Sequence, residues 1–286
     1  MTDLTGQTCL VTGATRGIGR ATAEALAKFG AHVVIHGRDS ASVGAVCRAL
    51  VRVARGGQVT GAVADFSSLK SVRRMADDVA AQHPRLDVLV NNAGAGARQR
   101  RMTADGFEWH FGVNHLAPFL LTNLLLPTLT NSAPARVVNV ASMAYRRAVL
   151  DFDDLQWERR KYRVLNVYSA SKLANVLFTL ELARRLSGTR VTANCLHPGV
   201  VATNLFASFG GTAGKIFGIL FRPLLMGPVA GAKTSVYVAS APELATVSGR
   251  FFERSRETPL DRAAQDAAAA LRLWDVSEEL VARARA

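Results

Sequence analysis

Short apolar runs alternate with longer amphipathic segments through the first half of the chain. The apolar runs are Thr8–Thr12, His32–His36, Val59–Ala64, Leu86–Val90 and Arg136–Val140. The segments with apolar positions at helical spacing are Arg20–Phe29, Ala41–Ala54, Leu69–Ala81 and Phe107–Leu129. Because strands that are apolar throughout are buried on both sides, this rhythm predicts a parallel β-sheet with helices on both faces.

The second half of the chain continues the pattern and brings the number of predicted strands to seven. A helix near Leu165–Leu186 precedes a strand at Val191–Leu196, and a helix near Gly231–Ser240 precedes a strand at Gly249–Phe252. A C-terminal helix is expected at about 262–284. No linker or change of composition divides the chain, so we expect a single α/β domain over residues 1–286.

Two apolar stretches raise the question of whether the chain enters a membrane. Residues 109–135 carry no Lys, Arg, Asp or Glu, but their three prolines and several Asn, His and Thr residues would be costly in lipid. A helix buried in the core or at a subunit interface is the favoured interpretation. The stretch Lys215–Met226 is too short to span a bilayer, so only a peripheral membrane contact at 212–228 is left open.

The formal net charge of +13 does not by itself identify a partner. The basic residues are spread along the chain, and neither zinc-finger spacing nor an RNA-binding aromatic signature accompanies them, so we expect no nucleic-acid partner. The three cysteines are widely separated, and no Cys/His set has metal-ligand spacing. We therefore expect a cytoplasmic protein without disulfides or a metal. The N-terminus lacks the pattern of a signal peptide.

A glycine-rich loop lies between the first predicted strand and the first predicted helix, at Thr12–Gly19. Gly13 permits a tight turn, Gly17 allows the backbone to approach a phosphate, and Gly19 allows close packing of helix and strand. The N-terminus of the following helix would favour a pyrophosphate. An ordinary β–α turn is the alternative, but the position of the loop favours nucleotide binding.

The spacing of this loop, G-x-x-x-G-x-G, resembles that of the short-chain dehydrogenase/reductase family. The resemblance implies a Rossmann-type, doubly wound NAD(P)-binding sheet with strand order 3-2-1-4-5-6-7. Family positions that contact the cofactor then match Thr15, Arg16 and Ile18 in the loop, and Asp65, Phe66, Asn92, Ala93 and Gly94 after the third and fourth strands. Asp65 has an alternative role as the cap of the helix that begins near Ser67 and Ser68.

The end of the second strand, His36-Gly37-Arg38-Asp39, indicates which nicotinamide cofactor is bound. An NAD-specific site places a carboxylate at the strand end, where this chain has Gly37. Asp39 is expected to cap the next helix together with Ser40. Because two guanidinium groups, from Arg16 and Arg38, can bind a 2′-phosphate, we predict NADP(H).

The candidate catalytic pair is Tyr168 and Lys172, which share one face of a helix at i and i+4. A neighbouring ammonium and an oxidised nicotinamide both favour the phenolate, so Tyr168 can serve as a general acid or base. The resemblance adds Ser142 as a hydrogen-bond donor to the substrate oxygen and Asn114 as the anchor of a relay water. It also implies that Lys172 holds the nicotinamide ribose and that residues after the sixth strand contact the cofactor, namely Pro198, Gly199, Val201 and Thr203.

The chain is most similar to the retinol-dehydrogenase-like and WW-domain-oxidoreductase-like branch of the family. The residues that carry this resemblance are Thr103–Glu108, Val113–Thr122, Ala133–Val140 and Ser171–Phe178. Family members place a substrate lid at the equivalent of about 204–230, which is apolar here and either binds an apolar substrate or packs on its own protein. Family members often dimerise through the two long helices that here hold Asn114 and Tyr168, so a homodimer is left open.

These residues together predict an NADP(H)-dependent oxidoreductase that interconverts an alcohol and a carbonyl, an aldehyde or a ketone, on an apolar small molecule. Two alternatives remain on the same fold. One is a reductase of C=C bonds in enone-type substrates, and the other is a non-catalytic NADP(H)-binding sensor.

Overall fold

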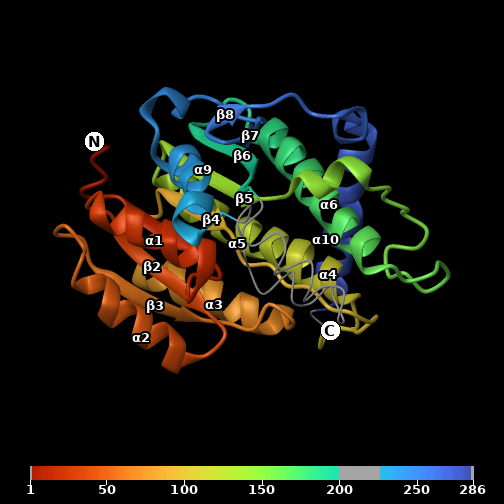
Figure 1. Ribbon diagram of the computed structural model, residues 1–286, viewed down its shortest axis with the longest axis horizontal. Coiled ribbons are helices and arrows are strands. Elements are labelled where there is room, and N and C mark those ends of the chain that lie inside the picture. The colour runs from red at the N-terminus through yellow and green to blue at the C-terminus, as the bar shows by residue number, and fades with distance from the viewer. Residues whose placement is uncertain (1, 200–225, 285–286) are drawn as a thin grey trace.

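Eight strands form one sheet in the computed structural model, which describes residues 2–199 and 226–284 (Figure 1). The strands are β1 (Thr8–Val11), β2 (His32–Gly37), β3 (Val59–Val63), β4 (Val88–Asn91), β5 (Ala135–Val140), β6 (Val191–His197), β7 (Phe251–Glu253) and β8 (Arg256–Glu257). Their order is β3-β2-β1-β4-β5-β6-β7-β8. The first seven pair in parallel and β8 is antiparallel to β7. The predicted α/β fold and strand order are confirmed, with β8 as an additional short edge strand.

Helices cover both faces of this sheet (Figure 1). The helices described are α1 (Gly17–Lys28), α2 (Ser40–Val51), α3 (Leu69–Gln82), α4 (Trp109–Phe111), α5 (Ala117–Asn131), α6 (Val164–Arg185), α9 (Pro228–Ser240) and α10 (Ala267–Arg283). Short turns of other helix types are η1 (Gly112–Leu116), η2 (Met143–Arg147), η4 (Pro242–Leu244) and η5 (Arg262–Gln265). One face carries α1, α2 and α9, whereas the other carries α3, α5 and α6, with α10 packed on α6.

Side chains of each central strand alternate between two separate apolar clusters. In β1, Cys9 and Val11 pack with α1 and α9 on one face, while Leu10 packs with α3, α5 and α6 on the other. All three are fully buried. Because both faces need apolar side chains, Cys9, Leu10 and Val11 are all apolar, and each buried Val or Leu contributes roughly 1.5–3 kcal/mol of burial free energy.

Most of the uncharged stretch 109–135 is buried, as predicted, but it is not one regular helix. Residues 109–131 form α4, the π-helical turn η1 and α5, and β5 begins at the last residue of the stretch. Pro118 explains the interruption, because a proline has no N–H to donate to the carbonyl of Asn114 four residues earlier and its ring would collide with that carbonyl. Within the described residues, no helix combines the length and the apolarity needed to cross a membrane.

The C-terminal helix begins later than predicted. Residues Arg262–Gln265 form a 3₁₀ turn, and α10 starts at Ala267. Asp266 determines this boundary, because its carboxylate accepts a hydrogen bond from the main-chain N–H of Ala269 at 2.9 Å and so caps the helix.

Helix α10 packs against the two helical segments that hold Asn114 and Tyr168. The ring of Trp274 lies 5.0 Å from that of Phe119 and 5.8 Å from that of Phe178, measured between centroids. Ser277 shares a 2.8 Å hydrogen bond with the Nε2 atom of His115. This part of the helical pair is therefore covered by the same chain, and the homodimer stays a prediction that would have to use the uncovered parts of these helices or another surface.

Replacement of Trp274 by alanine is expected to destabilise the fold strongly. Trp274 is only 4% exposed, and removal of a buried aromatic side chain costs about 3–5 kcal/mol through lost burial and a residual cavity. Urea unfolding followed by circular dichroism measures this loss. The exposed Glu278 on the same helix is the control, since Glu278→Ala should change the unfolding free energy by less than about 0.5 kcal/mol. Equal effects of the two substitutions would contradict this packing role.

Candidate active site

The predicted site residues come together at the carboxyl ends of the parallel strands. From β1 the strands β2 and β3 are added on one side of the sheet, and β4 begins the other side, so the strand order reverses at β1. In open α/β sheets such a reversal opens a crevice that binds ligands. Gly13 follows β1 and Asn92 follows β4, while Ser142 and Pro198 follow the neighbouring strands β5 and β6.

The glycine loop has the backbone conformation that its sequence requires. Gly13 and Gly17 have φ angles of +63° and +60°, a region that favours glycine. A Cβ on Gly19 would lie 2.4 Å from the main-chain oxygen of Gly13, whereas nothing lies within 4 Å of a Cβ on Gly17. The backbone of the loop is therefore in close contact with Gly19, whereas the space next to Gly17 is open. A backbone cradle of this kind at the start of α1 fits a pyrophosphate.

Thr12 and Asn92 join the glycine loop to the loop after β4. The Thr12 hydroxyl accepts hydrogen bonds from the main-chain N–H groups of Asn92 and Ala93, both at 2.9 Å. The Asn92 amide donates to the carbonyl of Thr12 at 2.7 Å and to that of Gly13 at 3.2 Å. The side chain of Asn92 thus holds the glycine loop by binding the main-chain carbonyls of that loop. Thr12 was missed as a site residue, although it stands directly before Gly13.

His36 is a second residue that the sequence analysis missed. Its Nδ1 atom accepts a hydrogen bond from the N–H of Gly13 at 3.1 Å, and its Nε2–H donates to the carbonyl of Ala64 at 3.1 Å. The ring stacks on Phe66 with centroids 4.4 Å apart. Burial lowers the pKa of His36 to about 4, which keeps the ring neutral so that Nδ1 can accept. The available signal for this role is a histidine near the end of a strand, directly before Gly37.

The end of β2 leaves no room for a side chain at Gly37. A Cβ there would lie 2.4 Å from Cγ2 of Thr15 and 2.8 Å from Cγ2 of Val43. Asp39 caps α2 as predicted, because its carboxylate accepts from the N–H of Ser42 at 2.8 Å. Arg38 is exposed beside this strand end, and an equally exposed Arg16 lies in the glycine loop.

Asp65 does not cap α3, contrary to the alternative considered above. Its carboxylate accepts from the N–H of Ser67 at 2.9 Å in a local turn, while the Ser68 hydroxyl accepts from the N–H of Ser71 and caps the helix. Ser68 directly precedes the first helical residue, so it can reach the free N–H groups and Asp65 cannot. Asp65 remains at the end of β3, where the cofactor contact was predicted.

Tyr168 and Lys172 lie one turn apart on α6, and both are buried. The Lys172 Nζ atom lies 5.7 Å from the centroid of the Tyr168 ring and donates a 2.9 Å hydrogen bond to the carbonyl of Val140. Burial raises the pKa of Tyr168 to about 12 and lowers the pKa of Lys172 to about 8. Both shifts arise because a desolvated site disfavours a charge. Near neutral pH the phenol is therefore protonated, and the amine next to it is mostly charged.

Ser142 joins this pair from the end of β5. A side-chain hydrogen bond between Ser142 and the Tyr168 phenol opposes part of the effect of burial on the tyrosine pKa. The Ser142 hydroxyl also accepts from the N–H of Ala144 at 3.2 Å, which holds it at the first turn of η2. Two hydroxyl groups thus lie close enough to bind the same substrate oxygen.

Asn114 lies in the π-helical turn η1 and holds the loop that follows β4. Its Oδ1 atom accepts from the N–H of Ala95 at 2.7 Å, and its Nδ2 atom donates to the carbonyl of Ala95 and to the hydroxyl of Ser171, both at 3.1 Å. A Cβ on Gly94 would lie 3.6 Å from Asn114 Oδ1 and 3.7 Å from Lys172 Nζ. Asn114, Gly94 and Lys172 are therefore immediate neighbours, and the side chain of Asn114 positions the loop.

The loop after β6 is described only as far as Gly199. Pro198 follows the strand end, and Gly199 has a φ angle of +88°. Val201 and Thr203, most of the predicted lid at 204–230 and most of the stretch 212–228 lie outside the described residues. Within residues 2–199 and 226–284, no three His, Cys, Asp or Glu side chains lie close enough together to hold a metal ion.

Comparisons with known proteins agree with this geometry. The sequence profile adh_short, described as short chain dehydrogenase, matches residues 7–212. Human (Homo sapiens) retinol dehydrogenase 14 is 45% identical over 291 residues, which cover 96% of this chain and 86% of that protein. Human retinol dehydrogenase 12 is 44% identical over 280 residues, which cover 98% and 87%.

Solved structures extend the likeness to the whole fold. An uncharacterised protein from Mycobacterium paratuberculosis superposes with a TM-score of 0.79 at 38% identity, covering 98% of this chain and 95% of that one. A protein from Beutenbergia cavernae, assigned as an NAD(P)-dependent gluconate 5-dehydrogenase and holding NADP at low occupancy, has a TM-score of 0.71 at 30% identity, covering 88% and 96%. By its fold, its profile match and its relatives, this chain belongs to the short-chain dehydrogenase family of oxidoreductases.

Proposed function

We propose that the chain interconverts an alcohol and a carbonyl group with NADP(H), using Tyr168 as the general acid and base. The observation that carries this proposal is a buried phenol that hydrogen-bonds Ser142 and has the Lys172 amine one helical turn away. In reduction the Tyr168 hydroxyl gives its proton to the carbonyl oxygen, and in oxidation its phenolate takes the proton of the alcohol. Ser142 stabilises the charge that develops on the same oxygen.

The electrostatics of the pair support this role. A phenol with a pKa of about 12 is a poor base at neutral pH. The charged form of Lys172 and the positive charge of an oxidised nicotinamide both favour the phenolate, and in a desolvated site their effect is larger than in water. The bound cofactor supplies or accepts the hydride, while Tyr168 and Ser142 act on the proton and the oxygen.

The cofactor proposal rests on the end of β2. Gly37 has no room for the carboxylate that would hold a ribose 2′-hydroxyl, and Asp39 is engaged as a helix cap. Arg16 and Arg38 remain exposed near this point and can form charge-assisted hydrogen bonds with a 2′-phosphate. These three features favour NADP(H) over NAD(H).

The substrate is proposed to be an apolar alcohol, aldehyde or ketone. The relatives named retinol dehydrogenase support an apolar molecule of this type. The apolar composition of residues 204–230 is consistent with it. A cytoplasmic location, suggested by the unpaired cysteines, stays a prediction.

Tyr168→Phe is expected to abolish turnover while cofactor binding persists. Loss of the phenolic proton should lower kcat/KM by about 100-fold or more, because general acid–base catalysis contributes roughly that factor. The NADPH dissociation constant, measured by fluorescence, should change by less than about twofold, since binding relies mainly on other residues. Stopped-flow NADPH oxidation with panels of aldehydes, ketones and enones measures the turnover. If wild type reacted only with enones, or with none of these compounds, the proposed reaction would be contradicted; turnover of carbonyl substrates by Tyr168→Phe at the wild-type rate would contradict the role of Tyr168.

Arg38→Asp is expected to change the cofactor preference. The substitution removes one guanidinium and places a negative charge beside the 2′-phosphate, so the NADPH dissociation constant should rise by about tenfold or more. The dissociation constant for NADH, which lacks that phosphate, should change by less than about threefold. Arg52→Asp, at an exposed position at the end of α2, is the control for the charge change. An unaltered ratio of the two affinities in Arg38→Asp would argue against NADP(H).

A further inference from the structure

We propose that Glu108, His110 and Tyr162, here called the Glu108 network, are positioning residues of the active site. They connect the loop 93–98, which adjoins Lys172, to the segment 149–163, which packs against Val167 and Ala170 of α6. This role rests on the proposed function, because it concerns the alignment of groups for the same reaction. The experiment below includes a readout that is independent of turnover.

Glu108 is the centre of this network. Its side chain is fully buried, its Oε1 atom accepts hydrogen bonds from His110 Nδ1–H and from the Tyr162 hydroxyl, both at 2.9 Å, and its Oε2 atom accepts from the N–H of Phe111 at 2.9 Å. Burial opposes ionisation of Glu108, but the hydrogen bonds from His110 and Phe111 outweigh it and the pKa lies below its ordinary value. A buried carboxylate depends on such donors, so each is costly to remove.

His110 connects this carboxylate to the loop after β4. Its Nε2 atom accepts a hydrogen bond from the N–H of Ala97 at 3.1 Å, so the ring proton must reside on Nδ1, where it points to Glu108. Asn114, one helical turn later, holds Ala95 of the same loop. Two side chains at i and i+4 therefore fix two main-chain N–H groups on the loop whose Gly94 faces Lys172.

Tyr162 connects the carboxylate to the segment that precedes α6. Burial, reinforced by the negative charge of Glu108, raises the pKa of Tyr162, so its hydroxyl stays protonated and donates. Gln156 of the same segment makes a second link, because its Oε1 atom accepts from the N–H of Glu108 at 2.6 Å. Asp154 organises the segment internally by accepting from the main-chain N–H groups of Glu158 and Arg160.

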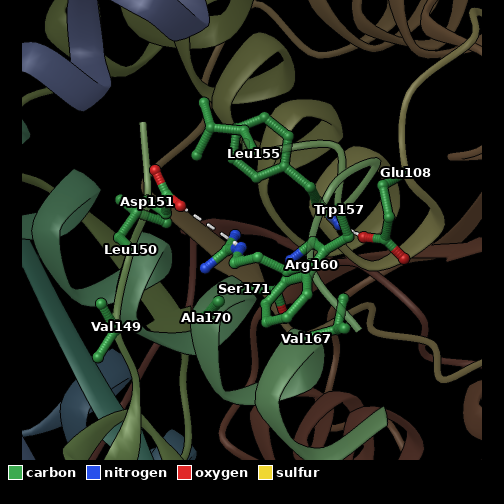
Figure 2. A pocket seen from close by; sticks show the side chains of 11 residues that line it. Glu108, Val149, Leu150, Asp151, Leu155, Trp157, Arg160, Val167, Ala170 and Ser171 are labelled. Atoms are coloured by element: carbon green, nitrogen blue, oxygen red, sulfur yellow. Dashed lines mark hydrogen bonds and ion pairs between the residues drawn. The ribbon is translucent and has the colours of Figure 1, made fainter. Parts of the chain in front are cut away.

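The segment is packed closely against α6. The cavity between them has a volume of about 10 Å³, barely enough for one water molecule. Figure 2 shows Leu155 and Trp157 of the segment across this cavity from Val167 and Ala170 of α6, with Glu108 at its edge. Val167 directly precedes Tyr168, so a displacement of the segment would also shift the turn of α6 that carries Tyr168.

Loss of the Tyr162 hydroxyl should therefore loosen the loop 93–98 and the segment 149–163 without removing any group that contacts substrate. Catalysis is sensitive to such loosening, since a misplacement of about 1 Å can reduce the rate by about 100-fold. Of the predicted cofactor contacts, only Ala93 and Gly94 lie on the loop 93–98, whereas the glycine loop with Arg16 and the end of β2 with Arg38 belong to other elements of the sheet. The affinity for NADPH should therefore fall less than turnover does. Turnover and cofactor affinity are thus expected to respond differently.

The test compares Tyr162→Phe with Tyr237→Phe, the same change at a half-buried tyrosine on α9. Amide hydrogen exchange is followed by mass spectrometry for peptides that cover 93–98, and kcat/KM and the NADPH dissociation constant are measured in parallel. In Tyr162→Phe, exchange at 93–98 should accelerate by about tenfold or more and kcat/KM should fall by a similar factor. The NADPH dissociation constant should rise by no more than about threefold, because most of the predicted cofactor contacts lie on other elements, and Tyr237→Phe should match wild type throughout.

Exchange at 93–98 that is the same in both variants would overturn the proposal, even if turnover changed. An equal loss of NADPH affinity and turnover in Tyr162→Phe would also overturn it, because a general structural defect produces that pattern. If Tyr162→Phe does not fold, Gln156→Ala takes its place, with the same expected pattern and the same contradicting results. If wild type turns over none of the carbonyl or alcohol substrates, the proposed function fails, and hydrogen exchange alone still decides the positioning role.

Discussion

The proposed chemistry depends on the removal of a phenol and an amine from water on one face of α6. Burial raises the pKa of Tyr168 to about 12 and lowers that of Lys172 to about 8, so at neutral pH the phenol is protonated while the amine still carries its charge. The hydrogen bond from Ser142 favours the phenolate, and a positive charge on the nearby Lys172 favours it as well. The rest of the site keeps this pair dry, oriented and next to the cofactor crevice.

Buried polar side chains that bind the backbone position the surrounding loops. Thr12 and Asn92 join the loops after β1 and β4, and His36 holds the N–H of Gly13. Asn114 holds Ala95 in the same manner. A buried polar group that loses its partner costs free energy, so these hydrogen bonds specify one arrangement of the loops. The catalytic groups can then be few, because their geometry is determined by residues that do not react.

The sequence predicts the parts of this structure that depend on local spacing. Continuous apolar runs identify the strands, and the i, i+4 spacing of Tyr168 and Lys172 places them on one helix face. The π-helical turn was missed, because Pro118 acts on the carbonyl of Asn114 only once the helix is built. The contact between Glu108 and Tyr162 was missed for a different reason. It joins positions 54 residues apart, and no local pattern encodes such a pairing.

The most direct test of the central claim is the titration of Tyr168 itself. Tyrosinate absorbance of wild type, minus that of Tyr168→Phe, isolates one phenol among the four tyrosines of the chain. Without cofactor, the pKa should lie near the value of about 12 that burial imposes. With NADP⁺ bound it should fall below the value of a free phenol, about 10, because the added positive charge stabilises the phenolate. A pKa that is the same with and without NADP⁺ would contradict the account.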